Sequence, residues 1–406
     1  MNSDHSQDQP LFISLIPHLM GGEGHIVPYH GAVRRSVEYL GWQYQAWVPQ
    51  DGDSNLEEIG DRLHQILLPE DLEAEGSTVA KITRLPQAMQ CGDVLAQQLQ
   101  ALLTDGKNRP VILFLERFIH LQLFAVWWGL RQLSPQARRR LHFWILYRRD
   151  VHLDQTRSIY HWLHQRLQKL LPPPQCQFLT DSEPLGRSLQ DYFRQPFTVM
   201  PIPHTDFAEV VPLSAEADPI LCWWPGAPRE EKGWSVMRHL VSLPTDNLPK
   251  LLKLKVIAAA ASGLKSNGEG IEVHLIGDRL TREEYAHWLN QVQVILLPYD
   301  SNAYAERTSG IFTEAIIAER IPLVSPGTWM ARELNQYDLN SLVMDWQAPS
   351  PIWPEIAQKL ADPAIHQRLA DMAQAYRRHH SLESYAKTLQ DVWLSRHNGN
   401  MEVNNM

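Results

Sequence analysis

Short apolar runs alternate with longer amphipathic stretches along the first half of the chain. Five of the runs are expected to be strands; they cover residues 11–16, 44–48, 111–115, 143–147 and 177–180. The stretches between them have helical spacing, including one at about 31–40 and an apolar one that contains Trp127 and Trp128. Strands separated by helices need crossover connections, and this arrangement predicts a parallel sheet.

The same pattern starts again in the second half. Strands are expected at 220–224, 272–276, 294–297 and 322–324, with helices between them and a mostly helical region from 356 to about 393. The segment at 199–203 resembles the end of a strand that runs into a Pro-punctuated connector, and polar and acidic residues follow through Ala217. The length of 406 residues also suits two domains. We therefore predict two Rossmann-like, doubly wound α/β domains at 1–203 and 204–378, with a further C-terminal segment at 379–406.

The overall charge is acidic, with a formal value of −9. Binding to a phosphate backbone needs a clustered positive surface, so a nucleic-acid partner is not expected. One short basic run exists, Arg138-Arg139-Arg140. Two interpretations of this run stay open: a solvated helix end, or a patch that docks on an anionic membrane.

Cysteine usage and hydropathy indicate the compartment. Cys91, Cys176 and Cys222 are widely spaced and show neither a disulfide framework nor a zinc-type pair, so a reducing cytoplasm is expected. The polar, acidic start of the chain does not resemble a secretory signal. No apolar stretch approaches the length of a membrane span, so an acceptor in a membrane would be met from its cytoplasmic side.

A glycine-rich turn follows the first expected strand. Gly21, Gly22 and Gly24 would let the backbone approach a ligand, and the start of the next helix would favour an anion. The spacing misses the dinucleotide fingerprint by its third glycine, so a dehydrogenase is not expected. A tight turn without a ligand remains the alternative. His25 has no carboxylate or third histidine close by in sequence to complete a metal site, so we expect it to make polar contacts at the edge of a cleft.

Charged residues follow two further strands of the first half. Glu116 comes after the strand at 111–115, and Arg149 and Asp150 come after the strand at 143–147. Ligands of open parallel sheets bind beyond the carboxyl ends of the strands, so these residues are candidates for acceptor binding or proton transfer. A solvated loop is the alternative for each of them.

One acidic pair resembles a metal-binding motif. Asp51-Gly52-Asp53 has the Asp-any-Asp pattern of metal-dependent sugar transferases, but it lies in a stretch with glycine, serine and asparagine. We interpret it as a turn and expect no metal site and no other cofactor.

The strongest functional signal lies in the second half. Arg229 and Lys232 follow the strand at 220–224, where positive side chains could neutralise a departing nucleoside diphosphate. Ser309 and Gly310 have the character of a helix start, whose free N–H groups face an anion. Glu314 lies one turn further into that helix and could accept hydrogen bonds from ribose hydroxyls. The alternative is that Ser309 only caps the helix and Glu314 only faces solvent.

These segments resemble the donor-binding domain of GT-B glycosyltransferases, most of all the family-4-type enzymes of bacterial polysaccharide synthesis. Glu306 and Glu314 have the family's Glu, seven residues, Glu spacing, although Arg307-Thr308-Ser309-Gly310 stands where the family usually has Gly-Phe-Gly. The resemblance implies that Arg229, Lys232 and Glu314 are catalytic. It implies donor contacts from a further set: Gly226, Tyr304, Glu306, Arg307, Ser309 and Gly310.

The resemblance also implies the overall arrangement and the activity. The two domains would face each other across a cleft, with the acceptor on the first domain and a C-terminal helix crossing back to it. The reaction would be a metal-independent transfer from a nucleotide-sugar donor to a saccharide or lipid-linked acceptor, with retention of configuration, in surface polysaccharide or glycoconjugate synthesis. The enzyme would be cytoplasmic, with peripheral contact to the inner face of the membrane. Two alternatives stay open: a nucleotide-sugar epimerase on the same fold, and a non-catalytic nucleotide-sugar-binding protein.

Overall fold

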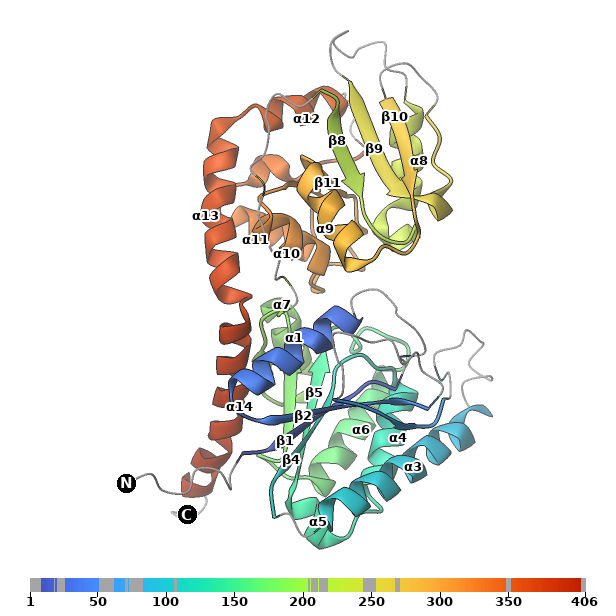
Figure 1. Ribbon diagram of the computed structural model, residues 1–406, viewed down its shortest axis with the longest axis vertical. Coiled ribbons are helices and arrows are strands. Elements are labelled where there is room, and N and C mark those ends of the chain that lie inside the picture. The colour runs from blue at the N-terminus through green and yellow to red at the C-terminus, as the bar shows by residue number, and fades with distance from the viewer. Residues whose placement is uncertain are drawn as a thin grey trace. The chain divides into compact units, whose positions relative to one another are not determined.

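Two compact α/β units make up the chain in the computed structural model (Figure 1). The first unit comprises residues 1–204 together with 381–406, and the second comprises 205–380. The structure describes residues 9–17, 19, 26–50, 62–69, 72, 83–105, 108–203, 205, 211, 218–243, 253–266, 271–347 and 352–402. Side chains are described up to residue 395.

A seven-stranded parallel sheet forms the centre of the first unit. Its order is β3-β2-β1-β4-β5-β6-β7, and every neighbouring pair is parallel. The strands are β1 (Leu11–Leu15), β2 (Gln43–Pro49), β3 (Leu63–Leu67), β4 (Val111–Leu115), β5 (Leu141–Tyr147), β6 (Cys176–Thr180) and β7 (Thr198–Val199). The order reverses between β1 and β4, so the two halves of the sheet are wound in opposite directions.

Helices cover both faces of this sheet because its strands are apolar on both sides. Phe143, Ile145 and Tyr147 of β5 pack into one core, and the alternate Trp144 and Leu146 pack into the other. The first face carries α3 (Leu85–Leu103), α4 (His120–Leu130), α5 (Pro135–Arg139), α6 (Arg157–Leu170) and α7 (Glu183–Phe193). The second face carries α1 (Ile26–Tyr39) and α14 (Leu382–Glu402).

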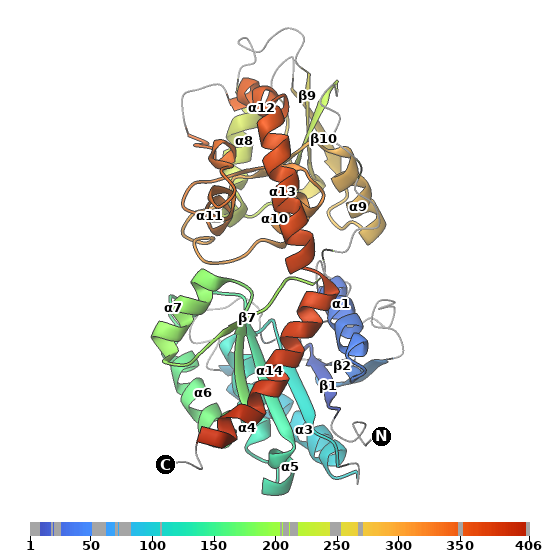
Figure 2. The ribbon, with the colours of Figure 1, turned by 90° about the vertical axis from the view of Figure 1, so that its left-hand side faces the viewer.

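The C-terminal helix α14 belongs to the first unit and packs beside α1 (Figure 2). Tyr385 of α14 and Tyr29 of α1 share a hydrogen bond between their hydroxyls, 3.0 Å apart. Trp393 packs edge-on against Trp42, with 5.8 Å between the ring centroids. The last helix therefore completes the core on that face of the sheet.

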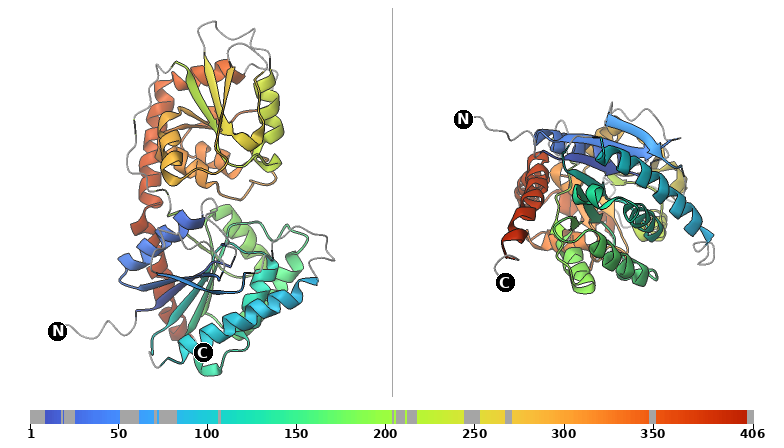
Figure 3. Two further views of the ribbon diagram at one scale, coloured as in Figure 1. Left: turned by 45° about the vertical axis from the view of Figure 1, so that its right-hand side comes forward. Right: turned by 90° about the horizontal axis from the view of Figure 1, so that it is seen from below.

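The second unit repeats the plan with five parallel strands in the order β10-β9-β8-β11-β12. These are β8 (Ile220–Trp224), β9 (Leu254–Ala259), β10 (Ile271–Ile276), β11 (Val294–Leu297) and β12 (Ile321–Val324). The helices are α8 (Trp234–Ser242), α9 (Arg282–Gln291), α10 (Gly310–Ile317), α11 (Trp329–Asn335), α12 (Ile352–Leu360) and α13 (Pro363–His379). Helices flank both sheets (Figure 3).

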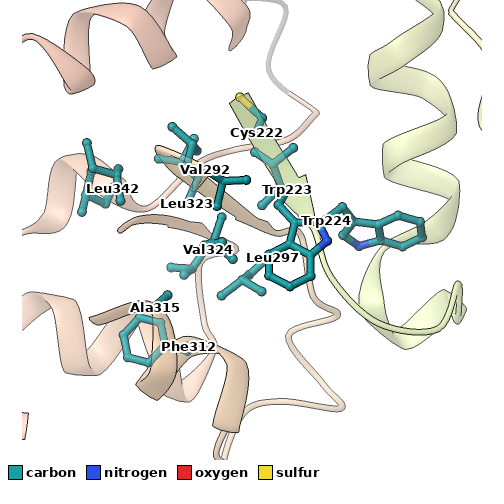
Figure 4. Packing of buried hydrophobic residues seen from close by; sticks show 14 of the residues in the cluster. Cys222, Trp223, Trp224, Val292, Leu297, Phe312, Ala315, Leu323, Val324 and Leu342 are labelled. Atoms are coloured by element: carbon teal, nitrogen blue, oxygen red, sulfur yellow. The ribbon is translucent and has the colours of Figure 1, made fainter. Parts of the chain in front are cut away.

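The core of the second unit forms around the adjacent strands β8 and β11. Trp223 and Trp224 extend from β8 beside Leu297 of β11, while Phe312 and Ala315 of α10 pack nearby (Figure 4). All five are at most 2% exposed. This packing holds the ends of β8 and β11 and the start of α10 in one place.

The expected fold class is confirmed, with corrections to individual elements. Helix α1 begins at Ile26 rather than near residue 31, because Pro28 is tolerated in a first turn whose N–H groups have no partner in the helix. Two strands were not anticipated, β3 and β9. The C-terminal helical region contains the three helices α12, α13 and α14. No helix in the described part of the chain has the length and apolar character to cross a membrane.

Candidate functional site

The carboxyl ends of β8 and β11 form the place where the strand order of the second unit reverses. The chain continues from β8 to β9 on one side and from β11 to β12 on the other. Such a reversal opens a crevice that binds ligands in open α/β sheets. The segment after β8 contains Arg229 and Lys232, and the segment after β11 leads through Arg307 to α10.

Two glycines bring these segments into contact. Gly233 has a φ of +81°, and a Cβ added there would lie 2.1 Å from the carbonyl oxygen of Pro298, so no side chain fits. Gly226 has a φ of +91°, and its Cβ would lie 2.9 Å from Lys232 Nζ. The Asp300 N–H also donates to the carbonyl of Glu231 at 3.0 Å. The backbone therefore fixes the distance between the two loops.

Lys232 is held inside this junction by a short 3₁₀ helix at Glu230–Lys232. The residue is only 9% exposed, and its Nζ lies 5.8 Å from the ring centroid of Tyr299. No described carboxylate lies within ion-pair distance of the ammonium. Burial and, second to it, Arg229 lower its pKa to about 8, while Glu231 opposes the shift. A buried cation without a close anion is suited to an anionic ligand.

Glu231 pairs with both arginines of the site. Its Oε1 lies 3.2 Å from Arg229 Nη1, and its Oε2 lies 3.7 Å from Arg307 Nη1. The side chain of Arg229 is 60% exposed, whereas that of Arg307 is 19% exposed. One carboxylate is thus shared by two guanidinium groups, and the ammonium of the adjacent Lys232 lies buried beside them.

The start of α10 is capped as the sequence indicates. Ser309 is 5% exposed, and its hydroxyl accepts a hydrogen bond from the Phe312 N–H at 3.2 Å. The N–H groups of Gly310 and Ile311 belong to the first turn and have no acceptor within the helix. Capping does not exclude anion binding, because the remaining first-turn N–H groups stay free of intrahelical bonds.

Glu314 lies buried against helix α9. It is 3% exposed, which rules out the solvent-facing alternative, and its Oε2 accepts a 2.5 Å hydrogen bond from the Tyr285 hydroxyl of α9. Burial raises the pKa of Glu314 to about 7, although Tyr285 and Arg282 act in the opposite direction. The carboxyl group is therefore partly protonated near neutral pH, and Tyr285 is a partner that the sequence did not reveal.

Tyr304 and Glu306 contribute less directly to the junction. The Tyr304 ring packs 4.5 Å from the Tyr299 ring, and its carbonyl accepts the Trp329 N–H at 2.8 Å. The Arg307 guanidinium lies 5.8 Å from the Tyr304 ring centroid. Glu306 is half-buried in the same loop. Tyr304 is thus a packing partner of Arg307 that shapes the loop.

The first unit has a second cluster of charges at the carboxyl ends of its strands. Arg148, after β5, lies between Glu116 after β4 (3.3 Å) and Asp181 after β6 (2.8 Å). His30 Nε2 of α1 lies 3.6 Å from Glu116 Oε1. Burial opposes the charge of Arg148, but Asp181 and Glu116 outweigh it and raise its pKa.

Arg149 and Asp150 are not part of this cluster. The exposed Arg149 side chain pairs with Asp154 at 3.2 Å, and Asp150 is half-buried in the same loop. Gly21, Gly22 and His25 lie outside the described residues, as does Asp51-Gly52-Asp53. Within the described ranges, no group of three or more His, Cys, Asp or Glu residues could hold a metal ion.

Comparisons with known proteins identify the fold. No protein-family model matches the chain, and no curated protein matches its sequence. Sucrose-phosphate synthase from Thermosynechococcus elongatus matches in structure with a TM-score of 0.60 and 12% identity, over 95% of this chain and 99% of that chain. HepE from Anabaena, in complex with UDP and glucose, matches with a TM-score of 0.61 and 9% identity, over 95% and 100%. This chain has the GT-B fold.

The GT-B fold does not decide the activity. A putative UDP-N-acetylglucosamine 2-epimerase from Listeria monocytogenes also matches, with a TM-score of 0.56 and 13% identity, over 93% of this chain and 94% of that chain. Function must therefore be argued from the residues of the site.

The structure brings together only part of the residues chosen from the sequence. Gly226, Arg229, Lys232 and Arg307 meet at the junction of the two loops. Glu314 instead joins Tyr285, whose ring lies 5.0 Å from that of Trp223. Sequence reasoning missed Glu231 and Tyr285 as partners. Glu231 could have been recognised from the sequence because it lies between Arg229 and Lys232, whereas no local pattern indicates Tyr285.

Proposed function

We propose that this chain is a glycosyltransferase that moves a sugar from a nucleotide-diphosphate-sugar donor to a saccharide or lipid-linked acceptor. The observation that carries the proposal is the gathering of the buried Lys232 with Arg229 and Arg307 where two loops meet at the β8–β11 reversal, beside the start of α10. In HepE, UDP and glucose are the bound molecules. The diphosphate of a nucleotide sugar carries the negative charge that Lys232 and the two arginines would attract.

Charge neutralisation is the central chemical step in this proposal. The bond between the sugar and the diphosphate breaks, and negative charge develops on the leaving phosphate oxygen. Lys232, Arg229 and Arg307 would stabilise that charge, together with the first-turn N–H groups of Gly310 and Ile311. A pKa of about 8 leaves Lys232 mostly protonated at neutral pH. Because cations of the chain supply the charge, the reaction needs no metal.

Glu314 would bind the ribose of the donor. Its buried carboxyl group accepts a hydrogen bond from Tyr285, and a ribose hydroxyl would donate to the same carboxyl group. Glu306, Tyr304 and Gly226 would shape the loops around the donor. The spacing of Glu306 and Glu314 supports the family-4 type and retention of configuration as parts of the same proposal.

The acceptor would bind to the first unit. Glu116 lies at the carboxyl edge of its sheet, where ligands of such folds bind, and Arg149, Asp150, Gly21, Gly22 and His25 follow strands that end at this edge. We place the reaction in surface polysaccharide or glycoconjugate synthesis in the cytoplasm. The free thiols of all three cysteines agree with a reducing compartment.

A ligand screen followed by product analysis tests this proposal. The thermal unfolding midpoint of the purified chain is measured with nucleoside diphosphates and nucleotide sugars, because a ligand of the folded state raises it. Stabilising donors are then incubated with saccharide and lipid-linked acceptors, and the products are analysed by mass spectrometry. We expect stabilisation by a diphosphate but not by the nucleoside alone, and a product enlarged by one sugar. Equal effects of both compounds would contradict the diphosphate site.

The epimerase alternative rests on the match to a putative UDP-N-acetylglucosamine 2-epimerase. Incubation of the donor without any acceptor separates the reactions, since an epimerase converts the sugar and a transferase needs the acceptor. A protein that binds donors without any conversion, hydrolysis included, would be a nucleotide-sugar-binding protein and would overturn the transferase proposal.

A further inference from the structure

Positive charge is concentrated in one stretch of the first unit. Residues 117–180 contain ten Arg or Lys residues and two Asp or Glu residues, whereas the whole chain contains 37 and 46. The helices of this stretch, α4, α5 and α6, pack on the same face of the seven-stranded sheet. An acidic protein therefore presents one strongly basic region.

A groove between α4 and α6 combines this charge with tryptophan. It is lined by Trp127 and Arg131 from α4 and its end, and by Trp162, Arg166 and Lys169 from α6. The rings of Trp127 and Trp162 meet edge-on at 4.9 Å. The Arg166 guanidinium lies 5.3 Å from the Trp162 ring, which holds the cation beside the aromatic surface.

Helix α6 also exposes apolar side chains on this side. Ile159 is 39% exposed and Trp162 is 37% exposed. Ile159, Trp162, Arg166 and Lys169 follow one another at intervals of three or four residues, so they lie on one face of the helix. This row of four residues thus begins with two apolar side chains and ends with two cations.

The groove runs toward the amino edge of the seven-stranded sheet, whereas the charged cluster of the first unit lies at the carboxyl edge. Because β4 and β5 are parallel, the helices that follow them run in the opposite direction, and Arg131 and Lys169 lie at the amino edge. Helix α5 lies at the same edge, with Arg138 and Arg139 in its last turn (Figures 1 and 2). Arg140 differs, since it donates to the carbonyls of Leu103 and Arg109. A partner on this face would leave the carboxyl edge open.

We propose that the α4–α6 face, formed by Trp127, Arg131, Ile159, Trp162, Arg166 and Lys169, docks on the surface of an anionic lipid bilayer. Tryptophan favours the level of the lipid headgroups, and nearby Arg and Lys side chains are attracted to anionic headgroups. The aliphatic side chain of Ile159 would contact the apolar part of the lipids just below the headgroups. This inference does not depend on the proposed transfer reaction.

The geometry favours a bilayer over a nucleic acid. Bases stack on the open faces of aromatic rings, but Trp127 and Trp162 are packed edge-on against each other, and Arg166 lies near the Trp162 ring. The apolar side chain of Ile159 would make no favourable contact with a phosphate backbone. A bilayer uses the apolar and the cationic parts of the face together.

Vesicle co-sedimentation of the full chain tests the proposal with charge-reversal variants. We expect binding to phosphatidylglycerol-containing vesicles, weakening with added salt, and none to pure phosphatidylcholine. Arg166→Glu with Lys169→Glu should weaken binding by roughly thirtyfold or more, since each cation near the surface contributes about fivefold. The matched control is Arg238→Glu with Lys265→Glu in the second unit, where Arg238 lies 4.7 Å from the Trp234 ring. The control should change binding by less than about twofold.

Two further variants separate a membrane surface from a general polyanion surface. Ile159→Ala with Trp162→Ala should weaken vesicle binding by roughly tenfold while the thermal midpoint confirms a folded chain. If charge reversal unfolds the protein, Arg166→Gln with Lys169→Gln replaces it, with roughly a twentyfold loss expected. Absence of binding to anionic vesicles overturns the proposal, as does equal loss in the control. Unchanged vesicle binding of the alanine variant, or equally tight binding of a single-stranded oligonucleotide, also overturns it.

Discussion

The two units share one strand order around their reversal points but differ in how charge is balanced at the carboxyl edge. In the first unit one cation, Arg148, lies between two carboxylates, Glu116 and Asp181. In the second unit one carboxylate, Glu231, pairs with Arg229 and Arg307 while Lys232 lies buried close by. In the first unit the cation is therefore outnumbered by the carboxylates that it pairs with, whereas in the second unit the shared carboxylate is outnumbered by its cationic neighbours.

The two units therefore show that the strand order determines where a ligand can bind, while the residues of the loops determine which charge that place carries. A closed ion cluster stabilises the first unit and holds the ends of β4, β5 and β6 together. Burying the ammonium of Lys232 without a close anion destabilises the free protein, and a bound anionic ligand would offset this effect. Each of the following experiments tests this difference between the two units.

The largest effect is expected for Arg148→Ala. Removing the cation leaves Glu116 and Asp181 buried without compensation, so the free energy of unfolding should fall by about 3 kcal/mol. Urea denaturation measures this change. Arg149→Ala is the matched control, because its exposed pair with Asp154 should contribute less than about 1 kcal/mol. Equal losses in the two variants would mean that the cluster is not a stabilising feature of the first unit.

Lys232→Ala should leave the fold intact and reduce turnover by roughly tenfold to a thousandfold, on the scale of one charge-stabilising donor. Arg229→Ala should have a smaller effect in the same range, because that side chain is mostly exposed and paired with Glu231. Steady-state kinetics with a donor from the ligand screen gives both values. Turnover of Lys232→Ala near that of the wild type would remove Lys232 from the diphosphate site.

Glu314→Ala should weaken nucleoside diphosphate binding by roughly tenfold to a hundredfold, and Glu314→Gln by less, because Gln keeps an acceptor oxygen. Calorimetry with the normal ligand and with its 2′- and 3′-deoxyribose analogues completes a double cycle. If Glu314 binds the ribose, the analogues should lose little further affinity in Glu314→Ala. Additive losses would instead make Glu314 a structural residue of α10 that holds Tyr285.

The pH dependence of diphosphate binding should report on Lys232. Burial lowers its pKa to about 8, so the free protein loses this charge as pH rises through 8, while a bound diphosphate would keep it protonated. The dissociation constant should therefore increase by roughly tenfold between pH 7 and 9. Calorimetry checks this against Lys232→Arg, whose charge persists. The same pH dependence in both variants would assign the titration to another group.

No change is expected when divalent cations are removed. The proposed site neutralises the diphosphate with Lys232, Arg229 and Arg307, so turnover should persist in excess chelator. Assays with chelator, and after addition of magnesium or manganese, check this directly. Loss of turnover that a metal restores would show that the side-chain cations of the second unit do not suffice.

The hydrophobic pattern was sufficient to predict the bounds of those strands whose residues are apolar throughout. The expected bounds of β4, β8 and β11 agree with the structure, because buried parallel strands are continuous apolar runs. Strand β9 escaped prediction because its sequence, Leu254–Ala259, is followed by further alanines that favour a helix. Only pairing with β8 and β10 makes that segment a strand. The edge strand β3 was missed because its pattern is weak.

The sequence by itself determined that two parallel α/β units follow one another, and that cations and a helix start follow particular strands of the second. These features are local, since they depend on the spacing of apolar residues and on glycine or cap residues near strand ends. Tertiary structure alone decided which side chains meet. Tyr285 on Glu314, Glu231 between two arginines, and Asp181 beside Arg148 are contacts between separate elements. Their formation, and the pKa shifts that burial adds, depend on packing that no local sequence pattern records.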